Sequence, residues 1–187
     1  MSTPSFDRAT TCCFSGYRPH KYPFPFASGN AEYNQLESDI MNAILISYRE
    51  GYRTFLCGGA MGFDLLCGEI VLLAKQQLPD IRLVCVLPFE GQAGSFPYDW
   101  AARYRKVLDA SDAITYVSTQ YTARCYLKRN EAMIDASARV ITYFDGKGGG
   151  TARTISYAQR QKLDIVNLCK TDPTPEQVTF FTGYTSK

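Results

Sequence analysis

The sequence predicts an α/β protein built on a mainly parallel sheet. Short apolar runs alternate along the chain with longer segments in which apolar residues recur every three or four positions. One run, Ile81–Leu87, is almost continuously apolar, as expected for a strand that helices cover on both faces. Another run ends in the glycine-rich turn Cys57–Asp64, which opens a segment of helical period. Repeated units of this kind favour parallel pairing of the strands.

The short apolar runs are the expected strands. In chain order they cover Thr10–Ser15, Arg53–Cys57, Ile81–Leu87, Ala113–Val117, Arg139–Phe144 and Asp164–Leu168. The third run stops at Pro88, because proline cannot donate a hydrogen bond within a central strand. A long loop rich in proline, tyrosine and phenylalanine, residues 16–29, follows the first run.

The periodic segments between the strands are the expected helices. In the first of them Leu36, Ile40 and Ile44 share one face, and Gly51 ends the segment. Pro79 marks the exit from the second. The five expected helices cover Ala31–Glu50, Asp64–Gln77, Tyr98–Ala110, Thr122–Ala136 and Ala152–Lys162.

The length and composition indicate one ordinary globular domain. The chain has 187 residues, enough for one substantial core but few for two independent domains. We expect a single domain over residues 1–187, with its core at about residues 10–169 and a polar tail at 170–187. A hydrophobic fraction of 45% and a net charge of +2 argue against a disordered or a nucleic-acid-coating protein.

The cysteines and the termini bear on the compartment. Seven cysteines, an odd number, lie mostly inside apolar runs, which favours a reducing environment and predicts a cytoplasmic protein. There is no Cys-x-x-Cys pair and His20 is the only histidine, so we expect no metal site. The sequence has neither a signal-peptide pattern nor an apolar run long enough to cross a membrane, so no membrane association is expected.

The turn Cys57–Asp64, with the sequence C-G-G-A-M-G-F-D, allows two interpretations. Glycines at a strand-to-helix turn let the backbone approach a ligand, and the free amides of the helix start can then cradle a phosphate. Tight turns also use paired glycines without any ligand. The first interpretation predicts a phosphate-bearing ligand, and the second predicts only a turn.

Four loops leave the carboxyl ends of expected strands, at residues 15–20, 57–64, 88–94 and 145–151. In open α/β sheets, ligands bind beyond these ends, near the point where the strand order reverses. Residues that are scattered along the sequence can therefore converge on one pocket.

Four motifs make the chain similar to a known family. They are F-S-G-Y-R-P at Phe14–Pro19, C-G-G-A-M-G-F-D at Cys57–Asp64, K-R-N-E-A-M at Lys128–Met133 and D-G-K-G-G-G-T at Asp145–Thr151. Together they resemble the YpsA-like branch of the SLOG superfamily, which groups the DNA-processing protein DprA with the LOG (lonely guy) phosphoribohydrolases. The resemblance covers roughly residues 10–169 and implies a Rossmann-like, three-layer fold with a site for nucleotides or nucleotide-derived ligands.

In the first motif, the resemblance implies a ligand-binding loop. Gly16 would allow a close turn, and Arg18 would form a forked ion pair with phosphate. Tyr17 and Tyr22 would either stack on a base or pack over the sheet. His20 lies in the same polar loop, where an exposed histidine is the simpler interpretation than a general base.

In the second motif, the resemblance implies an amide cradle. Gly58, Gly59, Ala60 and Gly62 would present backbone N–H groups to the ligand. Asp64 has two candidate roles, because its carboxylate could cap the helix start or accept a hydrogen bond from a ribose hydroxyl. Capping is the preferred role, since a carboxylate beside phosphate is unfavourable.

The third motif and the loop after the third strand add three candidates. Arg129 and Asn130 match the Arg-Asn step of the DprA-like pattern, and their side chains could reach an anion or a base edge. Without that match, both would be expected on a solvated helix face. Gln92 could contact the ligand from its loop.

The fourth motif offers a second amide-rich helix start. Gly148, Gly149 and Gly150 would approach phosphate, and the Thr151 hydroxyl would either bond it or cap the helix. LOG-type hydrolases carry a glutamate three residues beyond this threonine. Here that position is Thr154, which cannot supply the carboxylate that glycosidic cleavage requires. We therefore assign no catalytic residue and do not expect an enzyme of that kind.

Three functions remain open. The leading one is the binding or sensing of a nucleotide or nucleotide-derived phosphate ligand, with no other cofactor expected. The alternatives are a nucleotide-processing enzyme of the phosphoribohydrolase type and DprA-like binding of single-stranded DNA, which the modest net charge disfavours. Homo-oligomers are common among related folds, but the sequence identifies no interface.

Overall fold

The computed structural model describes residues 7–170, which contain a six-stranded sheet. Its strands are β1 (Thr11–Ser15), β2 (Thr54–Cys57), β3 (Arg82–Leu87), β4 (Ala113–Tyr116), β5 (Arg139–Thr142) and β6 (Asp164–Asn167). They lie in the order β4-β3-β2-β1-β5-β6, and every neighbouring pair is parallel. The α/β class that the sequence predicts is thus confirmed. Residues 171–187 of the expected polar tail lie outside the described residues.

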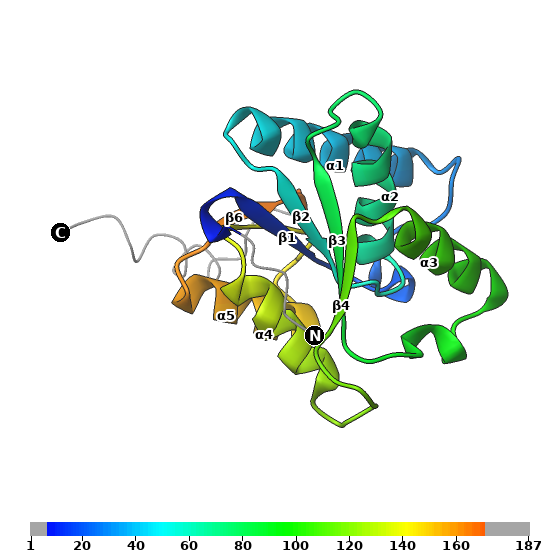
Figure 1. Cartoon of the computed structure of the whole chain (residues 1–187). Helices are drawn as coiled ribbons and strands as arrows, with labels where there is room; N and C mark the ends of the chain where they lie inside the picture. The colour runs from blue at the N-terminus through cyan, green and yellow to red at the C-terminus, as the bar shows by residue number, and fades with distance from the viewer. Residues whose placement is uncertain (1–6, 171–187) are drawn as a thin grey trace.

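Within residues 7–170, five α-helices cover the two faces of the sheet and complete three layers (Figure 1). They are α1 (Ala31–Arg49), α2 (Phe63–Lys75), α3 (Tyr98–Ala110), α4 (Cys125–Asp135) and α5 (Gly150–Arg160). Helices α1, α2 and α3 lie on one face of the strands, and α4 and α5 lie on the other. This is the Rossmann-like arrangement that the resemblance implies.

The core is divided in two by the sheet, because successive side chains of a strand point to opposite faces. On β2, for example, Phe55 packs in the cluster beneath α1, α2 and α3. Its neighbour Leu56 packs with Ile134 and Ile155 beneath α4 and α5. All of these side chains are almost fully buried. The apolar runs of β1, β2, β3 and β5 therefore reflect strands that are covered on both faces.

The starts of α4 and α5 differ from the expected ones. α4 begins at Cys125 rather than at Thr122, because the Cys125 N–H donates to the Thr122 carbonyl in a turn that precedes the helix. α5 begins at Gly150, before the expected Ala152. Gly149 stands immediately before it with φ of +136°, a conformation that favours glycine. The glycine run itself thus forms the start of α5.

The strand order reverses between β1 and β5. From β1 the chain builds outward through β2 and β3 to β4, and it then returns through α4 to β5 on the other edge of β1. β5 ends at Thr142 rather than at the expected Phe144, because the Phe144 N–H donates to the side chain of Asn167 instead of extending the ladder. The carboxyl ends of β1 and β5 therefore frame the position at which such folds bind ligands.

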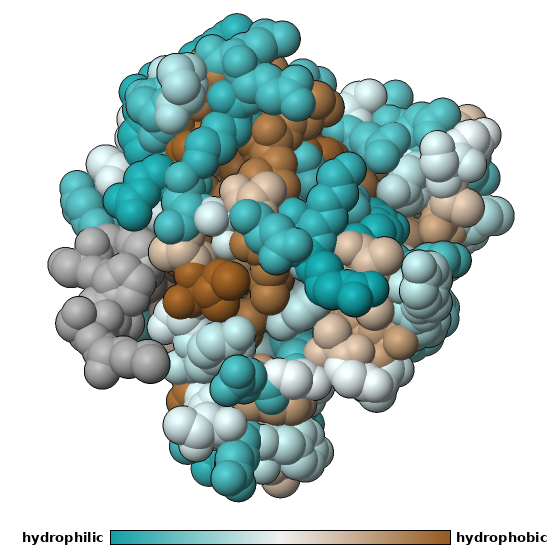
Figure 2. Space-filling model, turned by 45° about the vertical axis from the view of Figure 1, so that its right-hand side comes forward, coloured by the Kyte–Doolittle hydropathy of each residue, from teal (hydrophilic) through white to brown (hydrophobic). Residues whose placement is uncertain are grey.

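The surface of the described part is mixed in character. Figure 2 shows one face, on which hydrophilic side chains surround smaller hydrophobic areas. The large hydrophobic side chains that are exposed belong to Ile46, Leu73, Tyr98, Ile114, Tyr116 and Tyr121. No helix among residues 7–170 has the length and apolar character needed to cross a bilayer.

Candidate functional site

A cavity of about 250 Å³, which we call the switch-point pocket, opens where β1 and β5 end. The loops after β1 and β2 and the first turns of α4 and α5 line it. Of the residues that the sequence nominates for ligand binding, the pocket brings together Gly16, Arg18, Ala60, Asp64, Arg129, Asn130, Gly150 and Thr151. Segments far apart in the chain thus converge on one site.

The lining of the switch-point pocket carries more positive than negative charge. Arg18 and Lys21 come from the segment after β1, and Arg129 comes from α4. Among the described residues that line the pocket, Asp64 is the only acidic one. Within residues 7–170, neither Arg18 nor Lys21 forms an ion pair. The pocket is therefore suited to an anion.

The ammonium group of Lys21 lies at the start of α5. Its Nζ atom is 3.0 Å from the position that a Cβ on Gly149 would take. No side chain caps the N-terminus of α5, where the free N–H groups carry the positive end of the helix dipole. A cation beside this helix end is unfavourable by itself, whereas an anion between the two would be attracted by both.

The wall of the pocket contains a buried ion pair. Nη1 of Arg129 lies 3.2 Å from Oδ2 of Asp64, and the two side chains are only 5% and 8% exposed. Burial raises the pKa of the Asp64 carboxyl, while the charges of Arg129 and Arg18 oppose that rise. Nε of Arg129 is buried and has no hydrogen-bond partner among the described residues. The guanidinium is therefore incompletely satisfied by its partners in the described residues.

The glycines after β2 are explained by packing. A Cβ on Gly58 would stand 1.5 Å from Nη1 of Arg129, and a Cβ on Gly62 would stand 2.4 Å from the Tyr17 carbonyl oxygen. A Cβ on Gly59 would meet Leu87 and Tyr104, which belong to the core on the α1–α3 face. None of these three glycines lines the switch-point pocket, in contrast to Ala60 and Asp64 of the same loop.

Two amides of this loop already have partners in the protein. The Gly59 N–H donates to Sγ of Cys57, and the Phe63 N–H donates to the Tyr17 carbonyl. The expected phosphate cradle at this turn thus has fewer free donors than its sequence suggests. The start of α5 leaves more space for a ligand than the start of α2, since a Cβ on Gly150 would meet no atom within 4 Å.

The loop after β1 contacts helices α2 and α5. A Cβ on Gly16 would stand 2.4 Å from the ring of Phe63 in α2, so only glycine fits there. The Gly16 carbonyl accepts a hydrogen bond from Oγ1 of Thr151 in α5, at 3.2 Å. The Thr151 hydroxyl therefore joins two walls of the pocket.

Tyr17 and Gln92 do not line the switch-point pocket. The Tyr17 ring is buried edge-on against Tyr22 and Tyr143, and its hydroxyl bonds to the Asp145 carboxylate. Gln92 is buried, and its Nε2 donates to the Gly59 carbonyl at 2.6 Å. Both side chains hold loops in place. Tyr22, the other candidate for base stacking, is also buried.

Four residues that line the pocket were not predicted from the sequence: Phe14 and Ser15 at the end of β1, Lys21, and Tyr126. Lys21 belongs to the short 3-10 helix Pro19–Lys21, which turns its side chain back toward Gly149. Its position three residues after Arg18, in the same loop, was the feature of the sequence that could have indicated a second cation at the site. Tyr126 is the second residue of α4, and no motif distinguished it from the other tyrosines.

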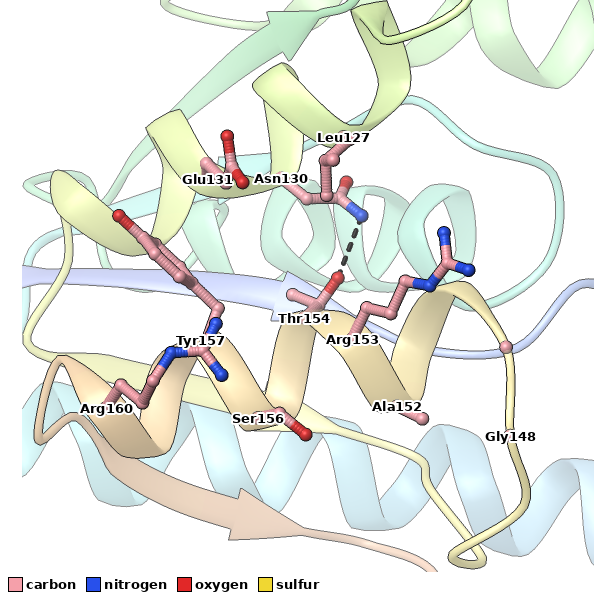
Figure 3. Close-up of a pocket in the computed structure, with 11 residues that line it drawn as sticks. Leu127, Asn130, Glu131, Gly148, Ala152, Arg153, Thr154, Ser156, Tyr157 and Arg160 are labelled. Atoms are coloured by element: carbon pink, nitrogen blue, oxygen red, sulfur yellow. Dashed lines mark hydrogen bonds between the residues drawn. The ribbon is translucent and has the colours of Figure 1, made fainter.

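A second, larger cavity of about 490 Å³ lies between α4 and α5 (Figure 3). Asn130 and Thr154 line it and point toward one another, and Nδ2 of Asn130 donates to Oγ1 of Thr154 at 2.8 Å. Asn130 lines both cavities, so its bonded side chain forms part of the wall between them. Gly148 and Gly149 lie on the side of the larger cavity.

Thr154 is the residue at the position of the LOG-type glutamate. It is 4% exposed, accepts the bond from Asn130 and donates to the Gly150 carbonyl at 3.0 Å. The bond from Asn130 joins α4 to α5, and the bond to Gly150 lies within α5. Within residues 7–170, no group of three or more His, Cys, Asp or Glu side chains is placed to hold a metal ion.

Comparison with known proteins identifies the family. The family model YpsA, described as the YspA SLOG family, matches residues 12–168. The chain is 29% identical over 131 residues to Uncharacterized SPbeta prophage-derived protein YoqJ of Bacillus subtilis, covering 64% of this chain and 76% of that protein. It is 24% identical over 172 residues to UPF0398 protein SH1465 of Staphylococcus haemolyticus, covering 91% and 89%. The resemblance that the four motifs suggest is confirmed.

Among solved structures, the chain is similar to DNA processing protein A from Helicobacter pylori, which was studied for its unique mode of binding single-stranded DNA. The TM-score is 0.64 at 17% identity, and the likeness covers 96% of this chain and 76% of that one. At this identity the likeness establishes a shared fold.

Proposed function

This chain belongs to the YspA SLOG family, and from that premise we propose that it binds a nucleotide or nucleotide-derived phosphate ligand in the switch-point pocket. The observation that carries the proposal is the convergence of Arg18, Lys21 and Arg129 on a cavity whose only acidic lining residue among those described is Asp64. The uncapped start of α5 adds free amides to the same wall.

Phosphate fits this arrangement for two reasons. Arg18 can offer parallel N–H donors to two phosphate oxygens, whereas Lys21 supplies a compact charge next to the helix start. The incompletely bonded guanidinium of Arg129 lies deeper in the wall. A ligand with two or three negative oxygens would satisfy donors that the protein alone leaves open.

The first test is to identify any small molecule that the purified protein retains. Mass spectrometry of material released from the native protein is expected to show a phosphate-bearing nucleotide or a derivative of one. The same analysis of Arg18→Gln is expected to show its loss. A compound that both proteins retain equally would lie outside the pocket that we propose.

Calorimetric titration tests the phosphate requirement directly. We expect adenosine monophosphate and ribose 5-phosphate to bind, and adenosine to bind much more weakly. Arg18→Gln should weaken the phosphate ligands by on the order of 10-fold or more, since a charged hydrogen bond contributes about 1.5–3 kcal/mol. Arg82→Gln is the matched control, because Arg82 is exposed at the opposite end of β3. Equal affinities for adenosine and its monophosphate would refute the proposal.

Single-stranded DNA is the second candidate ligand, favoured by the fold that the chain shares with DNA processing protein A. Binding of this kind would depend steeply on salt, because each neutralised DNA phosphate releases counterions. An oligothymidylate that binds far more tightly than the mononucleotide would favour DNA, provided that the slope of log affinity against log salt concentration corresponds to several neutralised phosphates. Similar affinities for the two would favour a small ligand.

Catalysis would require a carboxylate near the glycosidic bond of the ligand. Thr154 cannot supply it, and the Asp64 carboxylate is engaged with Arg129. The proposed function is therefore binding without turnover. Release of free base from the monophosphate, abolished in Asp64→Asn, would replace it with the enzymatic alternative.

A further inference from the structure

The switch-point pocket is small for an entire nucleotide. Its volume is about 250 Å³, whereas pockets for small molecules usually occupy roughly 300–1,000 Å³. If the phosphate lies among Arg18, Lys21 and the start of α5, the sugar fills much of the remaining space. The base must then extend beyond the pocket.

The lining of the pocket limits the direction in which the base can leave. Asn130 separates the pocket from the larger cavity, and its side chain is held by a hydrogen bond to Thr154. Two aromatic rings line the pocket, those of Phe14 and Tyr126. Phe14 is 2% exposed and packed in the core, while Tyr126 is only partly buried in the first turn of α4. Tyr126 is thus the aromatic side chain that can face a ligand.

The ring of Tyr126 is the inner member of an aromatic row. Phe89, in the loop after β3, meets Tyr126 edge to face with ring centroids 6.0 Å apart. Phe89 also meets Tyr121, in the loop after β4, at 5.5 Å. All three residues follow the carboxyl ends of strands in the same parallel sheet, on the side where the pocket opens.

The outer member of the row is exposed. Tyr121 is 65% accessible to solvent, although its ring is held by Phe89. Aromatic rings in such a position can bury a ligand base by stacking. The tyrosines nominated from the sequence for this role, Tyr17 and Tyr22, are 4% and 8% exposed and pack against each other.

We propose that the base of the ligand stacks on an aromatic ledge that runs from Tyr126, in the lining of the switch-point pocket, to Phe89 and Tyr121 outside it. This inference rests on the proposed function, because the phosphate in the pocket fixes the end from which the base extends. Stacking is tolerant of base identity, since every base has a π face. The ledge therefore separates nucleotides from sugar phosphates more strongly than it separates one base from another.

The test compares adenosine monophosphate with ribose 5-phosphate, which lacks the base, by calorimetric titration. The monophosphate is expected to bind more tightly to the native protein. Tyr121→Ala should weaken it by roughly five-fold or more, in keeping with base stacking, and leave ribose 5-phosphate unchanged. Tyr126→Leu, which keeps an apolar side chain, should give the same selective loss. Tyr98→Ala is the control, because Tyr98 is 81% exposed at the start of α3 and outside the ledge.

Each other result has a defined meaning. Equal affinities of the two ligands for the native protein, or an unchanged affinity of Tyr121→Ala and Tyr126→Leu for the monophosphate, would refute the ledge but leave phosphate binding intact. Selective loss in Arg153→Ala instead would place the base in the cavity between α4 and α5. If no phosphate ligand binds, the proposed function fails and the ledge fails with it.

Discussion

The guanidinium of Arg129 occupies the space in which a side chain at position 58 would stand. A Cβ on Gly58 would lie 1.5 Å from Nη1 of Arg129 and 2.6 Å from Oδ2 of Asp64. The glycine after β2 and the arginine of α4 therefore form one structural unit, although 65 residues separate Asp64 from Arg129 in the chain.

Gly58→Ala should destabilise the fold, because the new methyl group would displace the buried guanidinium from Asp64. We expect the free energy of unfolding in urea to fall by roughly 1–3 kcal/mol, as for other overpacked sites. Gly94→Ala is the control, since a Cβ there meets no atom within 4 Å and should change stability by about 0.5 kcal/mol at most. Equal free energies of unfolding for the two variants would mean that Arg129 can move without destabilising the fold.

Lys21→Gln should affect stability and binding in opposite directions. Without ligand, the variant removes a cation from the positive end of α5, so the free energy of unfolding should stay equal or rise slightly, by on the order of 0.3 kcal/mol, and the melting temperature with it. With phosphate ligands the affinity should fall. Thermal melts in phosphate and in chloride buffers of equal ionic strength separate the two effects. If the variant were less stable than the native protein in chloride, the charge of Lys21 would not be unfavourable at the start of α5.

Tyr22→Phe and Tyr17→Phe should change stability with opposite signs, although the two rings are 6.1 Å apart. The Tyr22 hydroxyl is buried and has no partner among the described residues, so its removal should stabilise by about 1 kcal/mol. The Tyr17 hydroxyl bonds to the Asp145 carboxylate, so its removal should destabilise by about 1.5 kcal/mol. Urea unfolding of both variants measures the difference. Destabilisation in both would indicate an ordered water at Tyr22.

Asp145 should contribute to the acid dependence of stability. Although burial opposes it, hydrogen bonds from Lys147 and Tyr17 lower the pKa of this carboxyl below its ordinary value of 3.8. On acidification the unfolded chain therefore takes up the proton first. The contribution of Asp145 is present above the unfolded pKa and is lost as the pH falls through the lowered folded pKa.

Measurement of Asp145→Asn against the native protein tests this sign. The difference in unfolding free energy should be constant between about pH 5 and 7 and should shrink below about pH 4. If the difference in unfolding free energy were undiminished at about pH 3, the hydrogen bonds of Asp145 would contribute to stability and its negative charge would not.

The fold was predictable because its signals are local. The continuous apolar run before Pro88 became β3, and the face of Leu36, Ile40 and Ile44 became the buried side of α1. The Asn30 side chain caps α1 by accepting from the Tyr33 N–H. Such patterns depend on neighbours in the sequence, and so do the motifs that revealed the family.

The role of each site residue was less predictable, because it depends on contacts across the fold. The paired glycines at 58 and 59 suggested free amides, but Arg129, Leu87 and Tyr104 fill the space beside them. A substitution such as Gly59→Asp would therefore disturb the core rather than test the pocket. Lys21 joined the site only because the turn after β1 brings it to Gly149.

The position of β1 between β2 and β5 also has a consequence for synthesis of the protein. As the chain leaves the ribosome, β1 can pair with β2 early, but its other edge has no partner until residues 139–142 have been made. An uncovered strand edge is a template for wrong pairing. The nascent chain thus carries a risk of aggregation beside the half-built pocket, until translation of β5 covers this edge of β1 and translation of α5 completes the site.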